Sequence, residues 1–257
     1  MTLPAGYRPL SVGEASGFAL EADAAWAEAA LREAGTLREW AGSGSGPGSD
    51  PGRDPGPTGR GEVHVLDRPD AEERIAVRPY RRGGWMAPLL DDRYLAVGTP
   101  RPLLELHASV AVRARGIPTP PVLAGAIYPA GVFYRADMVT LLIPGADLAA
   151  VLWGPDPCWP APRALEAAGR LVRTLEAAGV DHPDLNAKNI LVNPEEDGGT
   201  LYLLDLDRCR VGEPGRVRPT SMRPRLRRSL RKLGQMHARP LGRAEWSALA
   251  HGLGEDA

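Results

Sequence analysis

The spacing of apolar residues predicts a first half that is rich in β-strands and flanked by helices. Between residues 14 and 40, alanine, leucine and tryptophan recur at helical intervals, which predicts one or two helices. Two short strands are expected at 62–66 (EVHVL) and 74–80 (RIAVRPY), with the turn DRPD between them. A helix is expected at 101–116, ended by a glycine, and the broken apolar runs of 121–143 predict antiparallel strands.

The second half predicts helices that are interrupted by one polar loop. Residues 161–179 form an alanine-rich helical pattern that ends at a glycine. The segment 180–192 (VDHPDLNAKNILV) then passes from polar residues into an apolar strand, and 201–211 (LYLLDLDRCRV) predicts a further strand with two aspartates. The stretch 216–233 is strongly basic, with leucines at helical spacing, and predicts a basic amphipathic helix over 216–239.

These patterns predict an α+β fold in four segments. Residues 1–40 form an N-terminal helical segment, and 41–58 form a flexible insert because glycine and proline make up most of this stretch. Residues 59–143 form a small β-rich lobe. Residues 144–257 form a mainly helical lobe that includes the basic helix.

Composition adds few constraints. The chain of 257 residues is long enough for a substantial core, and its formal net charge of −1 does not indicate a nucleic-acid partner. Cys158 and Cys209 are too few for a disulfide framework and lack metal-ligand spacing, which fits a reducing compartment. The sequence shows no signal peptide and no membrane-spanning stretch, so we expect a protein that is soluble or attached to a membrane surface.

The polar loop carries the pattern His182-x-Asp184-x-x-x-x-Asn189, which matches the catalytic loop of protein-kinase-like phosphotransferases. In phosphoryl transfer, an aspartate beside the attacking hydroxyl orients it and accepts its proton. An amide oxygen a few residues later can bind a Mg²⁺ ion, and Asp205 can supply a second oxygen to the same ion. Each polar residue alone is more often a turn former, but the combination with its flanking helix and strands favours catalysis.

A kinase-like first lobe must bind the phosphates of ATP. Gly59 and Gly61, just before a predicted strand, are candidates for a glycine-rich phosphate loop. Arg78 occupies the strand position at which protein kinases have lysine, and Glu105 is the helical acid expected to pair with it. The alternative is that Arg78 is an exposed strand residue and Glu105 an ordinary charge on the surface of a helix.

Six stretches together resemble the bacterial lipopolysaccharide kinases, and among these the 3-deoxy-D-manno-octulosonic acid (Kdo) kinases most. They are VRPYRRGGWMAPLLDDRYL, GIPTPPVLAG, ADMVTLLIPGADL, RLVRTLEAAGVDHPDLNAKNILV, LYLLDLDRCRV and RLRRSLRKL. The resemblance covers roughly residues 58–235. It implies a protein-kinase-like two-lobed fold, and in that family an arginine at the strand position is common.

The resemblance also implies a reaction and its participants. ATP with Mg²⁺ would phosphorylate a hydroxyl, the 4-OH, of the Kdo sugar on a lipid A precursor, at the cytoplasmic face of the bacterial inner membrane. By position, Asp184 would be the general base, with His182 supporting its loop. Asn189 and Asp205 would be the metal ligands, Arg78 would bind phosphate, and Glu105 would hold Arg78.

An anionic, membrane-bound acceptor would require cations, and two groups of them are candidates. Arg81 and Arg82 follow the strand of Arg78, and the basic helix supplies Arg227, Arg228, Arg231 and Lys232. A basic amphipathic helix is typical of contact with anionic lipid. A solvated helix face and nonspecific nucleic-acid contact are the alternatives, although we expect no nucleic acid as partner. Lys188 either contacts the transferred phosphate or faces water.

Two further functions stay open at this stage. The same loop serves phosphotransferases that act on aminoglycosides, choline or free sugars, and the loop alone does not separate these from a Kdo kinase. The YRRGG turn and the basic stretch 216–233 favour the Kdo kinase. A non-catalytic pseudokinase module that binds a partner through its basic helix is the third possibility. The combination of Asp184, Asn189 and Asp205 argues against it, because a purely structural role does not require all three.

Overall fold

The computed structural model describes residues 2–43, 63–80, 93–195, 198–213 and 221–255. The chain divides into two compact units. Unit 1 comprises residues 1–107 and 121–142, and unit 2 comprises 108–120 and 143–257. Unit 1 is built mainly of strands and unit 2 mainly of helices, which confirms the predicted α+β class.

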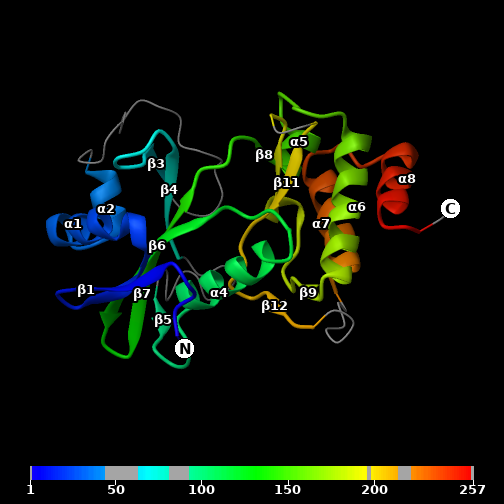
Figure 1. Cartoon of the computed structure of the whole chain (residues 1–257). Coiled ribbons are helices and arrows are strands. Elements are labelled where there is room, and N and C mark those ends of the chain that lie inside the picture. Colours follow the sequence, from blue (N-terminus) through cyan, green and yellow to red (C-terminus); the bar gives the residue numbers. More distant parts are fainter. Residues whose placement is uncertain (1, 44–62, 81–92, 196–197, 214–220, 256–257) are drawn as a thin grey trace. The chain divides into compact units, whose positions relative to one another are not determined.

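Unit 1 is an antiparallel sheet of seven strands in the order β1-β2-β6-β7-β4-β3, with β5 paired to β7 (Figure 1). The strands are β1 (Tyr7–Val12), β2 (Ala15–Leu20), β3 (His64–Asp67), β4 (Arg74–Pro79), β5 (Tyr94–Leu95), β6 (Val122–Ala130) and β7 (Phe133–Leu141). The helical elements are the 3₁₀ turn η1 (Glu21–Asp23) and the helices α1 (Ala24–Ala34), α2 (Leu37–Gly42) and α4 (Arg101–Arg113).

The helices α1 and α2 cover the core of this sheet. Buried residues of α1 and α2, such as Leu31 and Leu37, belong to the same apolar cluster as Ile75, Val77 and Val139 of the strands. The prediction of helix from residue 14 is therefore wrong for β2, and the N-terminal segment 1–40 also contains β1. The cause is tertiary: β2 pairs along its length with β1 and β6, and that pairing overrides its alanine-rich local pattern.

Two buried polar contacts attach the N-terminal segment to the sheet. Asp23 is 1% exposed and accepts hydrogen bonds from Nε and Nη2 of Arg68, both at 2.9 Å. The first N–H groups of α2 also find partners: Leu37 donates to the hydroxyl of Tyr128 and Arg38 to the carboxylate of Asp137. Residues 7–42 are therefore an integral part of unit 1.

Among its described residues, unit 2 contains five short strands, four helices, a 3₁₀ turn and the end of α4. The strands are β8 (Ala146–Asp147), β9 (Val180–Asp181), β10 (Ile190–Asn193), β11 (Thr200–Leu203) and β12 (Arg210–Val211). The helices are α5 (Leu148–Trp153), α6 (Ala161–Ala177), α7 (Met222–Met236) and α8 (Arg243–Gly252), and the 3₁₀ turn is η2 (Ala187–Asn189).

The core of unit 2 surrounds α6. This helix buries one continuous face, and α8 packs against it so closely that a Cβ added to Gly169 would lie 2.7 Å from the carbonyl oxygen of Leu249. The hairpin β10–β11 and the pair β9–β12 frame the polar loop, as Figure 1 shows in yellow and orange. The two strands that the sequence predicts after the loop are present, and they pair as an antiparallel hairpin.

Three predicted elements differ from the structure. The strand expected at 201–211 ends at Leu203, because Asp205 has a φ of 61°, which a strand does not allow, and a turn follows from Leu206 to Cys209. The helix expected at 216–239 spans 222–236 among the described residues, and α8 was not predicted. Of the insert 41–58, residues 41 and 42 belong to α2, and those from 44 onward lie outside the described residues.

The basic helix α7 uses its apolar face inside the protein. Leu226, Leu230 and Leu233 are 1%, 0% and 8% exposed and belong to the core of unit 2. The helix is therefore amphipathic, as predicted, but its leucines are not available to a lipid surface, which corrects the interpretation of its apolar face as a lipid contact. In the part of the chain that the structure describes, no helix combines the length and apolar character needed to cross a bilayer.

Candidate active site

The catalytic loop, residues 182–189, lies between β9 and β10. Its backbone turns at two places, where Leu185 donates to the carbonyl of His182 at 3.1 Å and Asn189 donates to that of Asn186 at 3.0 Å. The carbonyl oxygen of Asp184 accepts from the side-chain amides of Asn186 and Asn189, at 2.9 and 3.2 Å. Both asparagines therefore hold the backbone of Asp184 in place.

His182 joins this loop to the segment that carries Asp205. The imidazole is fully buried, and its Nε2 lies 3.0 Å from the carbonyl oxygen of Leu204, so that Nε2 carries the proton and donates it. The N–H of Leu204 donates in turn to the carbonyl of Asn189 at 2.9 Å. Two hydrogen bonds to one residue thus fix the catalytic loop beside the start of the next segment. This contact accounts for a supporting role of His182.

Asn189 and Asp205 lie at the same end of the β10–β11 hairpin. Ile190 pairs with Leu203 in the register, so Asn189 precedes the first pair of the hairpin and Leu204 follows it. The amide nitrogen of Asn189 donates to Asp184, so the amide oxygen is the atom with which Asn189 would bind a metal. One amide oxygen and one carboxylate from adjacent positions fit Mg²⁺, which takes few oxygen ligands from protein.

The carboxylate of Asp184 is bound by two arginines that the sequence analysis did not identify. Arg208 donates from Nη1 to Oδ2 at 2.9 Å, and Arg225 donates from Nη1 to Oδ1 at 3.4 Å. Asp184 raises the pKa of Arg208, chiefly through this hydrogen bond. Arg208 reaches the loop because β12 pairs with β9, and Arg225 because α7 contacts η2, where Ala187 donates to Ser229 Oγ at 3.2 Å. No local motif signals either contact.

In unit 1, the predicted pairing of Arg78 with Glu105 is confirmed. Arg78 on β4 donates to one carboxylate oxygen of Glu105 on α4, and the hydroxyl of Tyr80 donates to the other. Glu105 is only 5% exposed, and the guanidinium of Arg78 also lies over the ring of Tyr80, 5.2 Å from its centroid. Glu105 and Tyr80 therefore fix the orientation of Arg78.

Several predicted contact residues are not described, and others divide into two groups. Gly59, Gly61, Arg81 and Arg82 lie outside the described residues. On α7, Arg227 is partly buried and forms an ion pair with Glu255, whereas Arg228, Arg231 and Lys232 are exposed. The guanidinium of Arg231 lies 5.4 Å from the centroid of the Trp246 ring.

Lys188 is an exposed residue of the catalytic loop, and its backbone N–H donates to Asn186 at 2.9 Å. Burial raises the pKa of Asp147, which caps α5, and the charge of Lys188 opposes that rise. Lys188 therefore lies near enough to Asp147 for their charges to interact. Neither a phosphate contact nor a purely solvated position follows from this.

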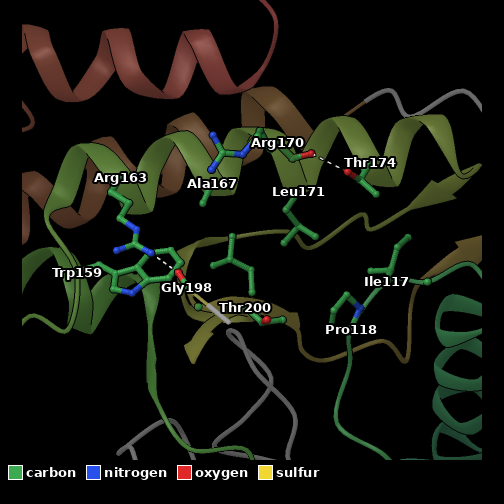
Figure 2. A pocket seen from close by; sticks show the side chains of 13 residues that line it. Ile117, Pro118, Trp159, Arg163, Ala167, Arg170, Leu171, Thr174, Gly198 and Thr200 are labelled. Carbon is green, nitrogen blue, oxygen red and sulfur yellow. Dashed lines mark hydrogen bonds between the residues drawn. The ribbon is translucent and has the colours of Figure 1, made fainter. Parts of the chain in front are cut away.

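A separate pocket of about 350 Å³ lies along α6 in unit 2 (Figure 2). Trp159, Arg163, Arg170 and Leu171 line one side and Thr200 of β11 lines another. The guanidinium of Arg163 stacks on Trp159, 4.2 Å from its centroid, and donates to the carbonyl of Gly198. None of the predicted site residues that the structure describes lines this pocket, so it is distinct from the catalytic loop.

Comparison with known proteins gives consistent matches. The model of the Lipopolysaccharide kinase (Kdo/WaaP) family matches residues 56–252. The 3-deoxy-D-manno-octulosonic acid kinase of Haemophilus influenzae (strain PittEE) is 35% identical over 191 residues, which cover 70% of this chain and 76% of that protein. The enzyme of the same name from Xanthomonas oryzae pv. oryzae (strain PXO99A) is 36% identical over 181 residues, 68% of each chain.

Two further matches are another kinase of this name and a solved structure. The kinase of the same name from Haemophilus influenzae (strain ATCC 51907 / DSM 11121 / KW20 / Rd) is 36% identical over 160 residues, 59% of this chain and 64% of that protein. Among solved structures, WaaP in complex with acyl carrier protein superimposes with a TM-score of 0.48 at 19% identity, covering 76% of each chain.

Proposed function

We propose, from the premise that the chain belongs to the lipopolysaccharide kinase (Kdo/WaaP) family, that it transfers the γ-phosphoryl group of ATP to a hydroxyl of a Kdo-bearing lipid A precursor. Membership of the family supports a protein-kinase-like fold and a phosphotransferase activity. The Kdo acceptor is supported by the names of the relatives at about 35% identity. The 4-OH is the hydroxyl that the resemblance implies.

One observation carries this proposal. The hydrogen bonds of Leu204 to His182 and Asn189 hold the loop of Asp184 against the segment of Asp205. The carboxylate proposed as proton acceptor and the two oxygens proposed as magnesium ligands thereby come from two segments that are hydrogen-bonded to each other in unit 2. This is the arrangement that phosphoryl transfer requires, because the enzyme mainly positions the reactants and neutralises charge.

Asp184 would accept the proton of the acceptor hydroxyl. The oxygen of that hydroxyl would bond to the γ-phosphorus of ATP while the bond between the γ-phosphorus and ADP breaks. Asn189 and Asp205 would hold Mg²⁺, which when bound neutralises charge on the phosphate oxygens. Arg78, oriented by Glu105 and Tyr80, would donate to phosphate oxygens through its guanidinium fork.

The test is an assay of phosphate transfer with labelled ATP, Mg²⁺ and a Kdo-containing lipid A precursor, beside the same lipid without Kdo. The unmodified protein is expected to label only the Kdo lipid. Asp184→Asn is expected to lower the rate by about 10²–10⁴-fold, the usual contribution of a general base. Arg210→Gln is the matched control, because Arg210 is an exposed arginine of β12, close in sequence to the site residues.

Two other outcomes would each redirect the assignment. ATP binding without transfer to the Kdo lipid would contradict the Kdo acceptor, and soluble alcohols such as aminoglycosides, choline and free sugars would be assayed next. Failure to bind ATP in the presence of Mg²⁺ would contradict catalysis itself and favour a pseudokinase.

We also propose that the protein acts at the cytoplasmic face of the inner membrane through exposed cations. Arg228, Arg231 and Lys232 project from two successive turns of α7, and each exposed cation near an anionic surface contributes about 1 kcal/mol. Since the leucines of α7 are buried, this contact would be electrostatic. Binding to vesicles that contain anionic lipid should therefore fall steeply with salt.

A further inference from the structure

The base that the proposed reaction needs is occupied by arginines. Each carboxylate oxygen of Asp184 accepts a hydrogen bond from one guanidinium, Oδ2 from Arg208 and Oδ1 from Arg225. An acceptor hydroxyl requires one of these oxygens as its own partner. The arginines must therefore move, or share the carboxylate, before the hydroxyl can bind productively.

The ion pairs of Asp184 with Arg208 and Arg225 contribute little to the stability of the fold. The side chains of Arg208, Arg225 and Asp184 are 55%, 41% and 36% exposed. Exposed ion pairs contribute little to stability, and the contact of Arg225 is long at 3.4 Å. The positions are nevertheless specific, because two elements distant in sequence, the segment before β12 and the helix α7, each direct one arginine to the same carboxylate.

The acceptor class supplies a second carboxylate. A 3-deoxy-octulosonic acid carries its carboxylate on C1 and a hydroxyl on C4, so the two groups are separated by only a few bonds. A hydroxyl placed at Asp184 brings the sugar carboxylate within reach of side chains that already touch Asp184. Arginine is the cation best suited to this role, because its planar fork matches the two oxygens of a carboxylate.

We infer, on the basis of the proposed function, that Arg208 and Arg225 bind the carboxylate of the sugar-acid acceptor. While no acceptor is bound, the carboxylate of Asp184 occupies the two guanidiniums instead. Arrival of the acid transfers the guanidiniums from Asp184 to the substrate and exposes an oxygen of Asp184 to the hydroxyl. Binding of the acidic acceptor thus frees the carboxylate of Asp184 to act as general base. The charges of Asp207 and Asp205 also raise the pKa of Arg208.

The test compares two acceptors, the Kdo lipid A precursor and the same lipid with its Kdo carboxylate converted to a carboxamide. The unmodified protein should prefer the acid by at least about tenfold in kcat/KM, the usual loss when a charge-assisted hydrogen bond is removed. Arg208→Gln and Arg225→Gln should each lower kcat/KM for the acid by about 10–100-fold, mainly through KM. Neither variant should lower kcat/KM for the carboxamide, so that the preference disappears.

Three controls separate recognition from folding. Arg208→Lys should recover part of the preference, because lysine keeps the charge without the fork. Arg210→Gln should keep all of it. Each variant should retain the thermal unfolding midpoint and ATP affinity of the unmodified protein. Equal use of both acceptors by the unmodified protein, or an equal loss on both in Arg208→Gln, would overturn the inference.

Binding of free Kdo, measured by calorimetry without ATP, separates this inference from the proposed function. Affinity for the free acid should fall at least about tenfold in Arg208→Gln, and affinity for its carboxamide should not change. If that holds while no lipid is phosphorylated, the proposed function fails and the recognition site stands. If free Kdo binds the variant as well as the unmodified protein, the inference fails even where the kinase activity is present.

Discussion

Asp137 shows how a single buried carboxylate is tolerated in unit 1. It lies on β7, is 4% exposed, and accepts hydrogen bonds from the N–H of Arg38 at 3.0 Å and the hydroxyl of Tyr128 at 2.8 Å. Burial raises the pKa of Asp137 above its ordinary value although both hydrogen bonds favour the ionised form. The folded protein therefore retains a proton on Asp137 at pH values where the unfolded chain has lost it.

The upward direction of this pKa shift predicts how the free energy of unfolding depends on pH. The contribution of Asp137 is complete below its unfolded pKa of about 3.9 and is lost as the pH rises through the raised native pKa. Asp137→Asn keeps an oxygen that can accept both hydrogen bonds and removes the charge. The variant should therefore lose less stability than the unmodified protein between acid and neutral pH. Urea unfolding at several pH values measures this, and parallel curves would contradict it.

At the scale of elements, α7 combines a structural and a functional face. Leu226 and Leu230 are buried in the core of unit 2, whereas Arg225 and Ser229 contact the catalytic loop from the same helix. Arg223 donates to Glu176 on α6, and Glu255 accepts from both Arg223 and Arg227. The position of α7 relative to Asp184 is therefore fixed by packing and by ion pairs together.

Truncation of one leucine of α7 should destabilise the protein rather than merely weaken membrane binding. Leu230→Ala is expected to lower the free energy of unfolding by about 2–5 kcal/mol, because it leaves a cavity at a fully buried position. Arg228→Gln on the same helix changes an exposed side chain and should alter stability by less than about 0.5 kcal/mol. Chemical denaturation compares the two, and equal stabilities would show that the leucine face is not packed.

Elements with a strong local pattern could be predicted from the sequence. The helices around 101–116 and 161–179 and the strands of 62–80 and 121–143 follow periodicity and glycine signals, and the structure has them close to these bounds. The strand β2 was missed, because its residues form a strand only through pairing with β1 and β6. α8 was missed as well, and its buried residues are few, Leu249 and Gly252 within the helix.

The residues of the candidate site that lie in local motifs could also be predicted from the sequence, whereas those placed by the fold could not. His182, Asp184 and Asn189 share one short motif, and Asp205 follows an apolar strand, so local spacing identified them. Arg208 and Arg225 were not identified, because their positions depend on the pairing of β12 with β9 and on the docking of α7. An arginine-rich sequence offers many cations, and only the fold distinguishes the two that contact Asp184.

At the scale of the whole molecule, the N-terminal segment extends the sheet beyond the part that matches the family. The family match begins at residue 56, yet β1 and β2 add two strands to the edge of β6, and α1 and α2 cover the core. The ion pair of Asp23 with Arg68 joins this segment to the β3–β4 hairpin. The segment should therefore unfold together with the rest of unit 1.

The contact between β2 and β6 offers a direct test of this cooperation. A Cβ added to Gly17 would lie 2.0 Å from the carbonyl oxygen of Gly125 and 3.0 Å from the Cα of Ala126, both backbone atoms of β6 that cannot move aside cheaply. Gly17→Ala should thus separate the two strands and lower the free energy of unfolding by about 3 kcal/mol, the upper part of the usual range for overpacking. Ser11→Ala, at an exposed position of β1, is the matched control.

Hydrogen exchange of the backbone amides then distinguishes a local from a cooperative effect. If the N-terminal segment is integral to unit 1, Gly17→Ala should speed exchange in β4 and β7 as well as in β2 and β6, because β6 links the segment to the rest of the sheet. Exchange in α6 of unit 2 provides the internal reference. Faster exchange confined to β1 and β2 would instead show that the segment is an appendage, and that the sheet of the matched family region is stable without it.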